Sequence, residues 1–178
     1  HKMVAGELDS GDIMSRAYFN INIETRIGEV YDWMNHQIPK LFSSAVSNIM
    51  NDSRYVLKVQ SKDPRNSLRC YPRRPEDGRI DWNSTAEEIV RLINASSEPY
   101  SGAFCFLGEN KIIIWRAKTY YDDELYLAVP GQVLKIDKAS SNIIVSTGFG
   151  KIEITEIQIN NERSKPIEVI NSIRKRLT

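Results

Sequence analysis

The chain has 178 residues, of which 41% are apolar and 26% charged, a composition typical of a folded globular protein. Its 24 lysines and arginines nearly balance 23 aspartates and glutamates, so no global field attracts nucleic acid or an anionic membrane. The longest apolar runs hold only a few residues, far short of the roughly 20 that a membrane-spanning helix needs.

Cysteine and histidine are sparse and do not form a metal-binding motif. Cys70 and Cys105 lie far apart, and the two histidines are not spaced with them as zinc ligands would be. The first residues are polar and glycine-rich, unlike a signal peptide. We therefore expect a cytoplasmic protein with no metal and no membrane partner.

The first elements are a strand and a long helix. Alternation of apolar residues predicts a half-buried strand over 13–23, and apolar positions at steps of three or four predict a helix that follows Thr25. A short strand is predicted over 55–59. One strand and one helix cannot bury their own apolar faces, so we expect that further structure precedes this chain.

A long loop and a second helix come next. Residues 60–82 contain three prolines and little periodicity, and an ordered loop of this length is typical of a functional segment. Ser84 or Thr85 with an acidic residue three positions later indicates a capping box. The helix that it starts is expected to end before Pro99.

Short β-type runs dominate after Pro99. They read "AFCFL", "KIIIWRA", "GQVLKI", "NIIVST" and "KIEITEIQI", and clusters of Gly, Asn and Ser separate them, which is typical of a small antiparallel barrel or sandwich. "PIEVINSIRKRL" (166–177) predicts a final helix that begins at a proline and ends basic. These patterns divide the chain into 1–100 and 101–178.

The opening stretch "HKMVAGELDSGDI" concentrates acids and glycines just ahead of the predicted strand. Asp and Gly are turn formers, so a β-turn is one interpretation of these residues and a site is the other. Glycines allow a backbone to approach a flat ring closely.

An ordered series of motifs resembles one enzyme superfamily. "H-x-M…LDSGDI", then "CYPRRPEDGRIDW…EIVRLINASSEPYSGAF", then "PGQVLKI" is similar to the 10-formyltetrahydrofolate-dependent formyltransferases, and most similar to the nucleotide-sugar N-formyltransferases. The resemblance implies an α/β fold, namely the second half of a Rossmann-like core (1–100) followed by an OB-like antiparallel β-barrel and a C-terminal helix (101–178). It also implies 10-formyltetrahydrofolate as co-substrate, without a metal.

The resemblance also implies site residues near the N-terminus. Asp9 matches the catalytic aspartate of the "LDxG" loop, whereas the Asn-x-His pair that completes the family's catalytic trio has no match in this chain. His1 matches a histidine outside the trio. The expected pterin-binding segment comprises Val4, Ala5, Gly6, Glu7, Leu8 and Asp9.

Five arginines and no lysine occupy fifteen residues of the long loop: Arg65, Arg69, Arg73, Arg74 and Arg79. The planar guanidinium matches phosphate oxygens, so Arg73 and Arg74 are candidate ligands for a diphosphate. Ion pairs with Glu76, Asp77 and Asp81 are the alternative interpretation. Tyr71, Tyr120 and Tyr121 are candidate stacking partners for a base.

The predicted function is transfer of a formyl group to the amino group of a dTDP- or UDP-linked sugar for cell-surface polysaccharide synthesis. A methionyl-tRNA formyltransferase is an alternative, but it would be expected to carry a more basic second domain. A non-enzymatic OB-type binding module is another, although its aromatic and basic residues are scattered. We expect a nucleotide-sugar partner and no nucleic acid, and a homodimer is left open.

Overall fold

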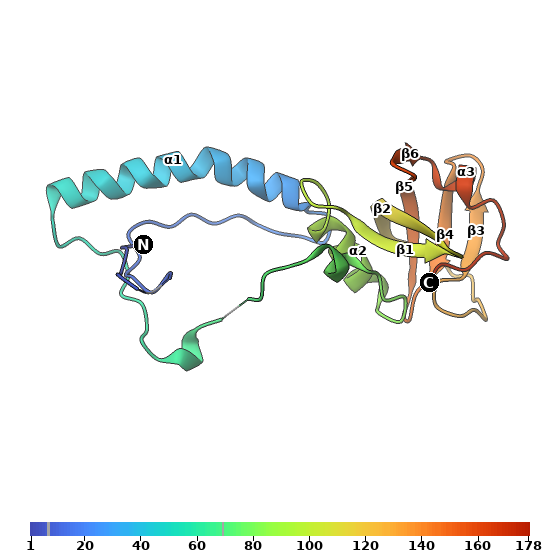
Figure 1. Ribbon diagram of the computed structural model, residues 1–178, viewed down its shortest axis with the longest axis horizontal. Coiled ribbons are helices and arrows are strands. Elements are labelled where there is room, and N and C mark those ends of the chain that lie inside the picture. The colour runs from blue at the N-terminus through green and yellow to red at the C-terminus, as the bar shows by residue number, and fades with distance from the viewer. Residues whose placement is uncertain (7, 69) are drawn as a thin grey trace. The chain divides into compact units, whose positions relative to one another are not determined.

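The computed structural model describes residues 1–6, 8–68 and 70–178, and its contacts define two compact units (Figure 1). One unit comprises His1–Asn20 and Glu29–Pro72, and the other comprises Ile21–Gly28 and Arg73–Thr178. Helix α2 therefore falls in the same unit as the strands that follow it. Among the described residues, no helix has both the length and the apolar character needed to span a membrane.

The long helix forms as the spacing predicts. It is α1, Ile27–Asn51, and it includes Pro39. None of its residues is buried, and its apolar side is open at Ile38, Phe42, Val46 and Ile49. The predicted apolar stripe exists, and nothing in the described part of the chain fully covers it.

The two strands predicted in this region are wrong. Residues 13–23 and 55–59 contribute only one isolated antiparallel bridge, between Ile13 and Lys58. An extended segment becomes a strand only where a neighbour pairs with its amides and carbonyls along its length, and a single bridge does not supply that pairing. The long loop contains two 3₁₀ turns, η1 (Pro64–Asn66) and η2 (Pro75–Gly78).

The second helix is α2, Ala86–Ala95, and its predicted cap is confirmed. Thr85 Oγ1 accepts from the amide of Glu88 at 3.2 Å, and Glu88 Oε2 accepts from the amide of Thr85 at 2.9 Å. These two bonds satisfy amides that the first turn of a helix leaves unpaired. The buried side of α2 carries Ile89 and Ile93 and packs against the sheet (Figure 1).

The predicted antiparallel β-domain is confirmed as a six-stranded sheet. Its strands are β1 (Ala103–Leu107), β2 (Asn110–Thr119), β3 (Val133–Asp137), β4 (Asn142–Ser146), β5 (Lys151–Ile159) and β6 (Glu162–Ser164). The order is β1-β2-β5-β4-β3, with β6 paired to β5. Isoleucines from β2, β4 and β5 fill the core, because β-branched side chains pack well on a pleated surface.

The predicted final helix is wrong beyond its first turn. Helix α3 covers only Pro166–Val169. The last residues are extended instead: Thr178 exchanges two backbone hydrogen bonds with Phe106 of β1, and the amide of Leu177 donates to Gly131 just before β3. These residues satisfy backbone groups at both edges of the sheet, and a helix would leave those groups unpaired.

Candidate functional site

The loop that contains Asp9 is held in shape by hydrogen bonds to its backbone. The amide of Lys2 donates to Asp12 O at 2.8 Å, and Gln60 Nε2 donates to Asp9 O at 2.8 Å and to Gly11 O at 2.5 Å. A Cβ at Gly11 would lie 1.8 Å from the carbonyl oxygen of Lys2, so only glycine fits there. These contacts therefore hold the loop in a specific shape.

Asp9 presents its carboxylate at the surface of this loop. Its backbone has φ +56°, in the left-handed region, and its side chain is 85% exposed. Oδ1 lies 3.1 Å from Nε2 of His1. Asp9 thus lies beside the imidazole of His1, which the family resemblance places outside the catalytic trio, and its pairing with the catalytic histidine stays a prediction.

The remaining residues of the expected pterin-binding segment are exposed where the structure describes them. Val4, Ala5, Gly6 and Leu8 are all accessible, and Gly6 adopts φ +80°. Glu7 lies outside the described residues, as does Arg69 of the arginine cluster. Among the described residues, no group of three or more acidic, histidine or cysteine side chains is arranged to hold a metal ion.

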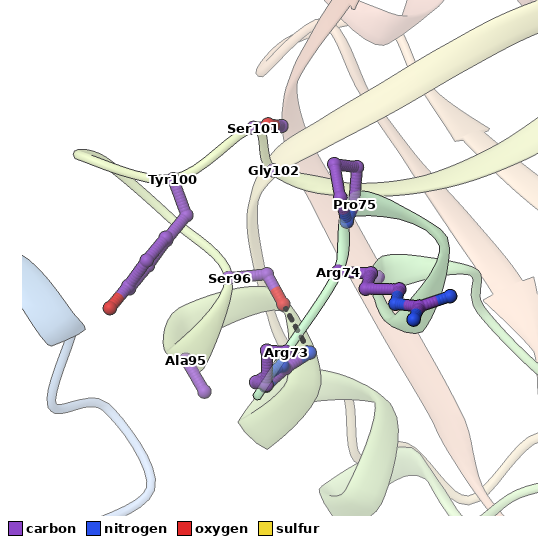
Figure 2. Close-up of a pocket in the computed structure, with 9 residues that line it drawn as sticks. Arg73, Arg74, Pro75, Ala95, Ser96, Tyr100, Ser101 and Gly102 are labelled. Carbon is purple, nitrogen blue, oxygen red and sulfur yellow. Dashed lines mark hydrogen bonds between the residues drawn. The ribbon is translucent and has the colours of Figure 1, made fainter. Parts of the chain in front are cut away.

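Arg73 and Arg74 line a small pocket in the second unit (Figure 2). The cavity has a volume of about 120 Å³ and lies between η2, the end of α2 and the turn that leads into β1. Its lining residues are Arg73, Arg74, Pro75, Gly78, Ala95, Ser96, Tyr100, Ser101 and Gly102. We call it the arginine pocket.

Neither guanidinium in the arginine pocket forms an ion pair with a described carboxylate. Arg73 Nη2 donates to Asp77 O at 3.2 Å and to Ser96 Oγ at 3.3 Å. The carboxylate of Asp77 accepts instead from the backbone amide of Arg74 at 2.8 Å. Figure 2 shows Arg73 directed at Ser96 and the Arg74 guanidinium pointing away from it. Both positive charges therefore stay available to an anion.

Other arginines of the cluster have partners. Arg65 is ion-paired with Asp63 at 2.6 Å, and the guanidinium of Arg79 lies 5.6 Å from the centre of the Phe106 ring. Asp81 accepts from both the amide and the side chain of Asn83, and these hydrogen bonds lower the pKa of Asp81. Arg65 is therefore ion-paired with Asp63, and none of the three acids expected as partners forms an ion pair with a described arginine of the cluster.

The three candidate tyrosines are not brought together at the arginine pocket. Tyr71 is exposed and belongs to the first unit, whereas Tyr120 and Tyr121 follow β2 in the second. Neither Tyr120 nor Tyr121 lines the pocket. Tyr100 does, and spacing in the sequence could not predict this, because the return of the chain after α2 places Tyr100 at the pocket.

Comparison with known proteins places this unit in a family. The model of the formyl transferase C-terminal domain matches residues 73–174, more than half of the chain. The chain therefore belongs to that family. The resemblance to the C-terminal part of the formyltransferases, drawn from the motifs alone, is confirmed.

Individual relatives agree with this assignment. The chain is 29% identical, over 179 aligned residues and 98% of its length, to the bifunctional polymyxin resistance protein ArnA of Wigglesworthia glossinidia brevipalpis. It spans about a quarter (25%) of that protein. Structures of HypX from Aquifex aeolicus share the fold at 17% identity. The structure of one HypX variant aligns with a TM-score of 0.65, and the alignment covers 94% of this chain and 29% of the HypX chain. The structure of HypX in complex with tetrahydrofolic acid aligns with a TM-score of 0.64, and the alignment covers 95% of this chain and 29% of that one.

Proposed function

We propose that these residues form the C-terminal part of an enzyme that transfers a formyl group from 10-formyltetrahydrofolate to the amino group of a nucleotide-linked amino sugar. Family membership and the folate-bound neighbour support the transfer. The observation that carries the sugar-nucleotide acceptor is the arginine pocket, where neither guanidinium is paired with a described carboxylate and Arg73 donates to Asp77 O and Ser96 Oγ. The chain is 29% identical to ArnA, a polymyxin resistance protein, and we propose a cytoplasmic location for the reaction.

The reaction needs a neutral amine, a group that accepts its proton, and donors for the developing oxyanion. We assign to Asp9 the role of orienting an imidazole and stabilising its protonated form, as in other acid–imidazole pairs. The proposed partner is the Asn-x-His pair of a preceding segment. Asp9 lies on a loop that Gln60 holds in place, and its carboxylate, which contacts His1 through Oδ1, is accessible for such a contact.

The acceptor would place its diphosphate against Arg73 and Arg74. Charge-assisted, bidentate hydrogen bonds from arginine suit phosphate oxygens. The pocket itself is small, so it would hold a phosphate and not a whole nucleotide. Tyr71, Tyr120 and Tyr121 remain proposed contacts for the base, and Val4 to Asp9 the proposed pterin-binding segment.

The proposed domain assignment has 1–100 as the end of the catalytic domain and 101–178 as the OB-like domain. The alternative acceptor, methionyl-tRNA, would call for a strongly basic surface to neutralise phosphates. A formal net charge of +1 disfavours it.

Calorimetry on the complete polypeptide tests the proposal. Arg73→Ala and Arg74→Ala should each weaken UDP or dTDP binding by roughly 1–3 kcal/mol, the value of a charge-assisted hydrogen bond, and leave folate affinity unchanged. Arg91→Ala is the matched control, because Arg91 is an exposed arginine of the same unit that is ion-paired with Glu87. If the two pocket variants lost affinity for the nucleotide and for folate equally, the loop would have collapsed, and this result would contradict the assignment.

A further inference from the structure

The turn between α2 and β1 forms one wall of the arginine pocket. Ser96, Tyr100, Ser101 and Gly102 all come from it. Two hydrogen bonds set its internal shape: the amide of Gly102 donates to Ser96 O at 2.9 Å, and the amide of Tyr100 donates to Ser97 O at 3.0 Å. These local bonds do not fix where the turn lies relative to the outer strands.

Glu98, in the middle of this turn, holds it to the rest of the unit. Its Oε1 pairs with Nη2 of Arg163 on β6, and its Oε2 pairs with Nη2 of Arg26 at 3.1 Å. One carboxylate thus binds two arginines from distant parts of the sequence. Backbone packing adds to this, since a Cβ at Gly28 would lie 3.1 Å from Glu98 O.

Both arginines are themselves held in place. Arg163 Nη1 pairs with Glu156 Oε1 on β5 at 2.6 Å, and its guanidinium lies 4.5 Å from the Trp115 ring. Arg26 is only 18% exposed and also donates to the carbonyl of Trp115 at 3.3 Å. Each cation therefore has a second anchor on the sheet, which makes the arrangement stiffer than an isolated surface ion pair.

The chain of alternating charges extends through β2. Glu156 Oε2 accepts from Arg116 Nε at 3.0 Å, so Arg116, Glu156, Arg163, Glu98 and Arg26 form one network. Partial burial raises the pKa of Glu98, but the hydrogen bonds and the charges of Arg163 and Arg26 outweigh that effect and leave it below the usual value. Glu98 is therefore ionised, as the network requires, at neutral pH.

We infer that Glu98, held between Arg163 and Arg26, is a positioning residue that places the pocket wall carrying Ser96 and Tyr100. The assignment of a diphosphate to that pocket rests on the proposed function, whereas the positioning itself does not. Glu98 and Arg163 do not line the arginine pocket, so they act through the turn.

Glu98→Gln and Arg163→Met in the complete polypeptide test this inference. Amide hydrogen exchange across residues 96–102 should become faster in both. Affinity for UDP or dTDP should fall about ten-fold, within the range for residues of one ion-pair network, with kcat and folate affinity unchanged. Arg116→Met is the matched control, since it removes an arginine of the same network that does not touch Glu98, and its exchange in the turn should match the wild type.

The double variant separates positioning from general stability. If Arg163 acts through its contact with Glu98, then Glu98→Gln combined with Arg163→Met should lose no more affinity than Glu98→Gln alone, which already removes the pairs with both arginines. Unchanged exchange in the turn of both single variants would overturn the inference. A wild-type protein that binds no nucleoside diphosphate would overturn the proposed function, while the exchange measurement would still decide the positioning.

Discussion

Phe106 and Thr178 exchange a pair of backbone hydrogen bonds of 2.7 and 2.9 Å. Phe106 lies on β1, at one edge of the sheet, and the neighbouring Leu177 and Lys175 bond to the other edge, at Gly131 and Val133. The last residues of the chain therefore connect both edges of the sheet, and they bring the 1% exposed Leu177 into the core.

Loss of this connection should destabilise the second unit. We expect Leu177→Ala to lower the free energy of unfolding by about 2–5 kcal/mol, because it removes a fully buried leucine from a packed site. Ile173→Ala is the control, since Ile173 is 55% exposed and a surface change is worth about 0.5 kcal/mol or less. Urea denaturation measures both. Equal effects of the two changes would show that the terminal segment is not part of the core.

The open side of α1 should make the 178-residue chain self-associate. Phe42 is 70% exposed on the same helix as exposed Ile38, Val46 and Ile49, and contiguous apolar patches of this kind bind partners or aggregate. Light scattering and binding of an apolar dye should both be high, and Phe42→Glu should reduce them. If the unmodified chain were a monomer that binds no dye, this result would contradict the expectation that the open side of α1 binds a partner.

The two cysteines should differ sharply in reactivity. Burial raises the pKa of Cys105 from 9.0 to about 12, while Cys70 is exposed. Mass spectrometry after alkylation at pH 8 should show one label, on Cys70, until the protein unfolds. Since folding raises the pKa of Cys105, the protonated thiol contributes fully to the free energy of unfolding below pH 9, and this contribution is lost as the pH rises towards 12. Labelling of folded Cys105 at the rate of Cys70 would contradict its burial.

Asp9 and Gln60 should have separable effects on the complete polypeptide. Asp9→Asn keeps the shape of the side chain but cannot stabilise a charged imidazole, so turnover should fall by as much as about 10⁴, as in a comparable acid–imidazole pair, with folate affinity retained. Gln60→Ala removes the hydrogen bonds that hold Asp9 O and Gly11 O, so folate affinity and turnover should fall together. Steady-state kinetics and folate titration distinguish the two. Normal turnover in Asp9→Asn would remove Asp9 from the mechanism.

Local signals in the sequence predicted local structure correctly. The Thr85 cap depends on residues three positions apart, and the strands from β1 to β5 follow from runs of β-branched residues between turns. The predictions that failed depend on distant partners. Residues 170–177 have a helical pattern, but the edges of the sheet compete for their backbone groups. Among the described residues, only Lys58 forms a β-bridge with residues 13–23.

The same distinction applies to the candidate site. Arg73 and Arg74 could be selected from the sequence because arginine without lysine is a compositional signal. Ser96 and Tyr100 carry no such signal, and only the return of the chain after α2 places them in the arginine pocket. The ion pair between Glu98 and Arg26 joins residues 72 positions apart, so spacing could not predict it.

Formyl transfer by the complete polypeptide tests the central claim most directly. The purified enzyme is incubated with 10-formyltetrahydrofolate and a dTDP- or UDP-linked amino sugar, and tetrahydrofolate release and the mass of the sugar nucleotide are measured together. We expect one tetrahydrofolate for each sugar nucleotide that gains a formyl group, with strongly reduced turnover at low substrate in Arg73→Ala and Arg74→Ala. Formylation of methionyl-tRNA with no transfer to any amino-sugar nucleotide would contradict it.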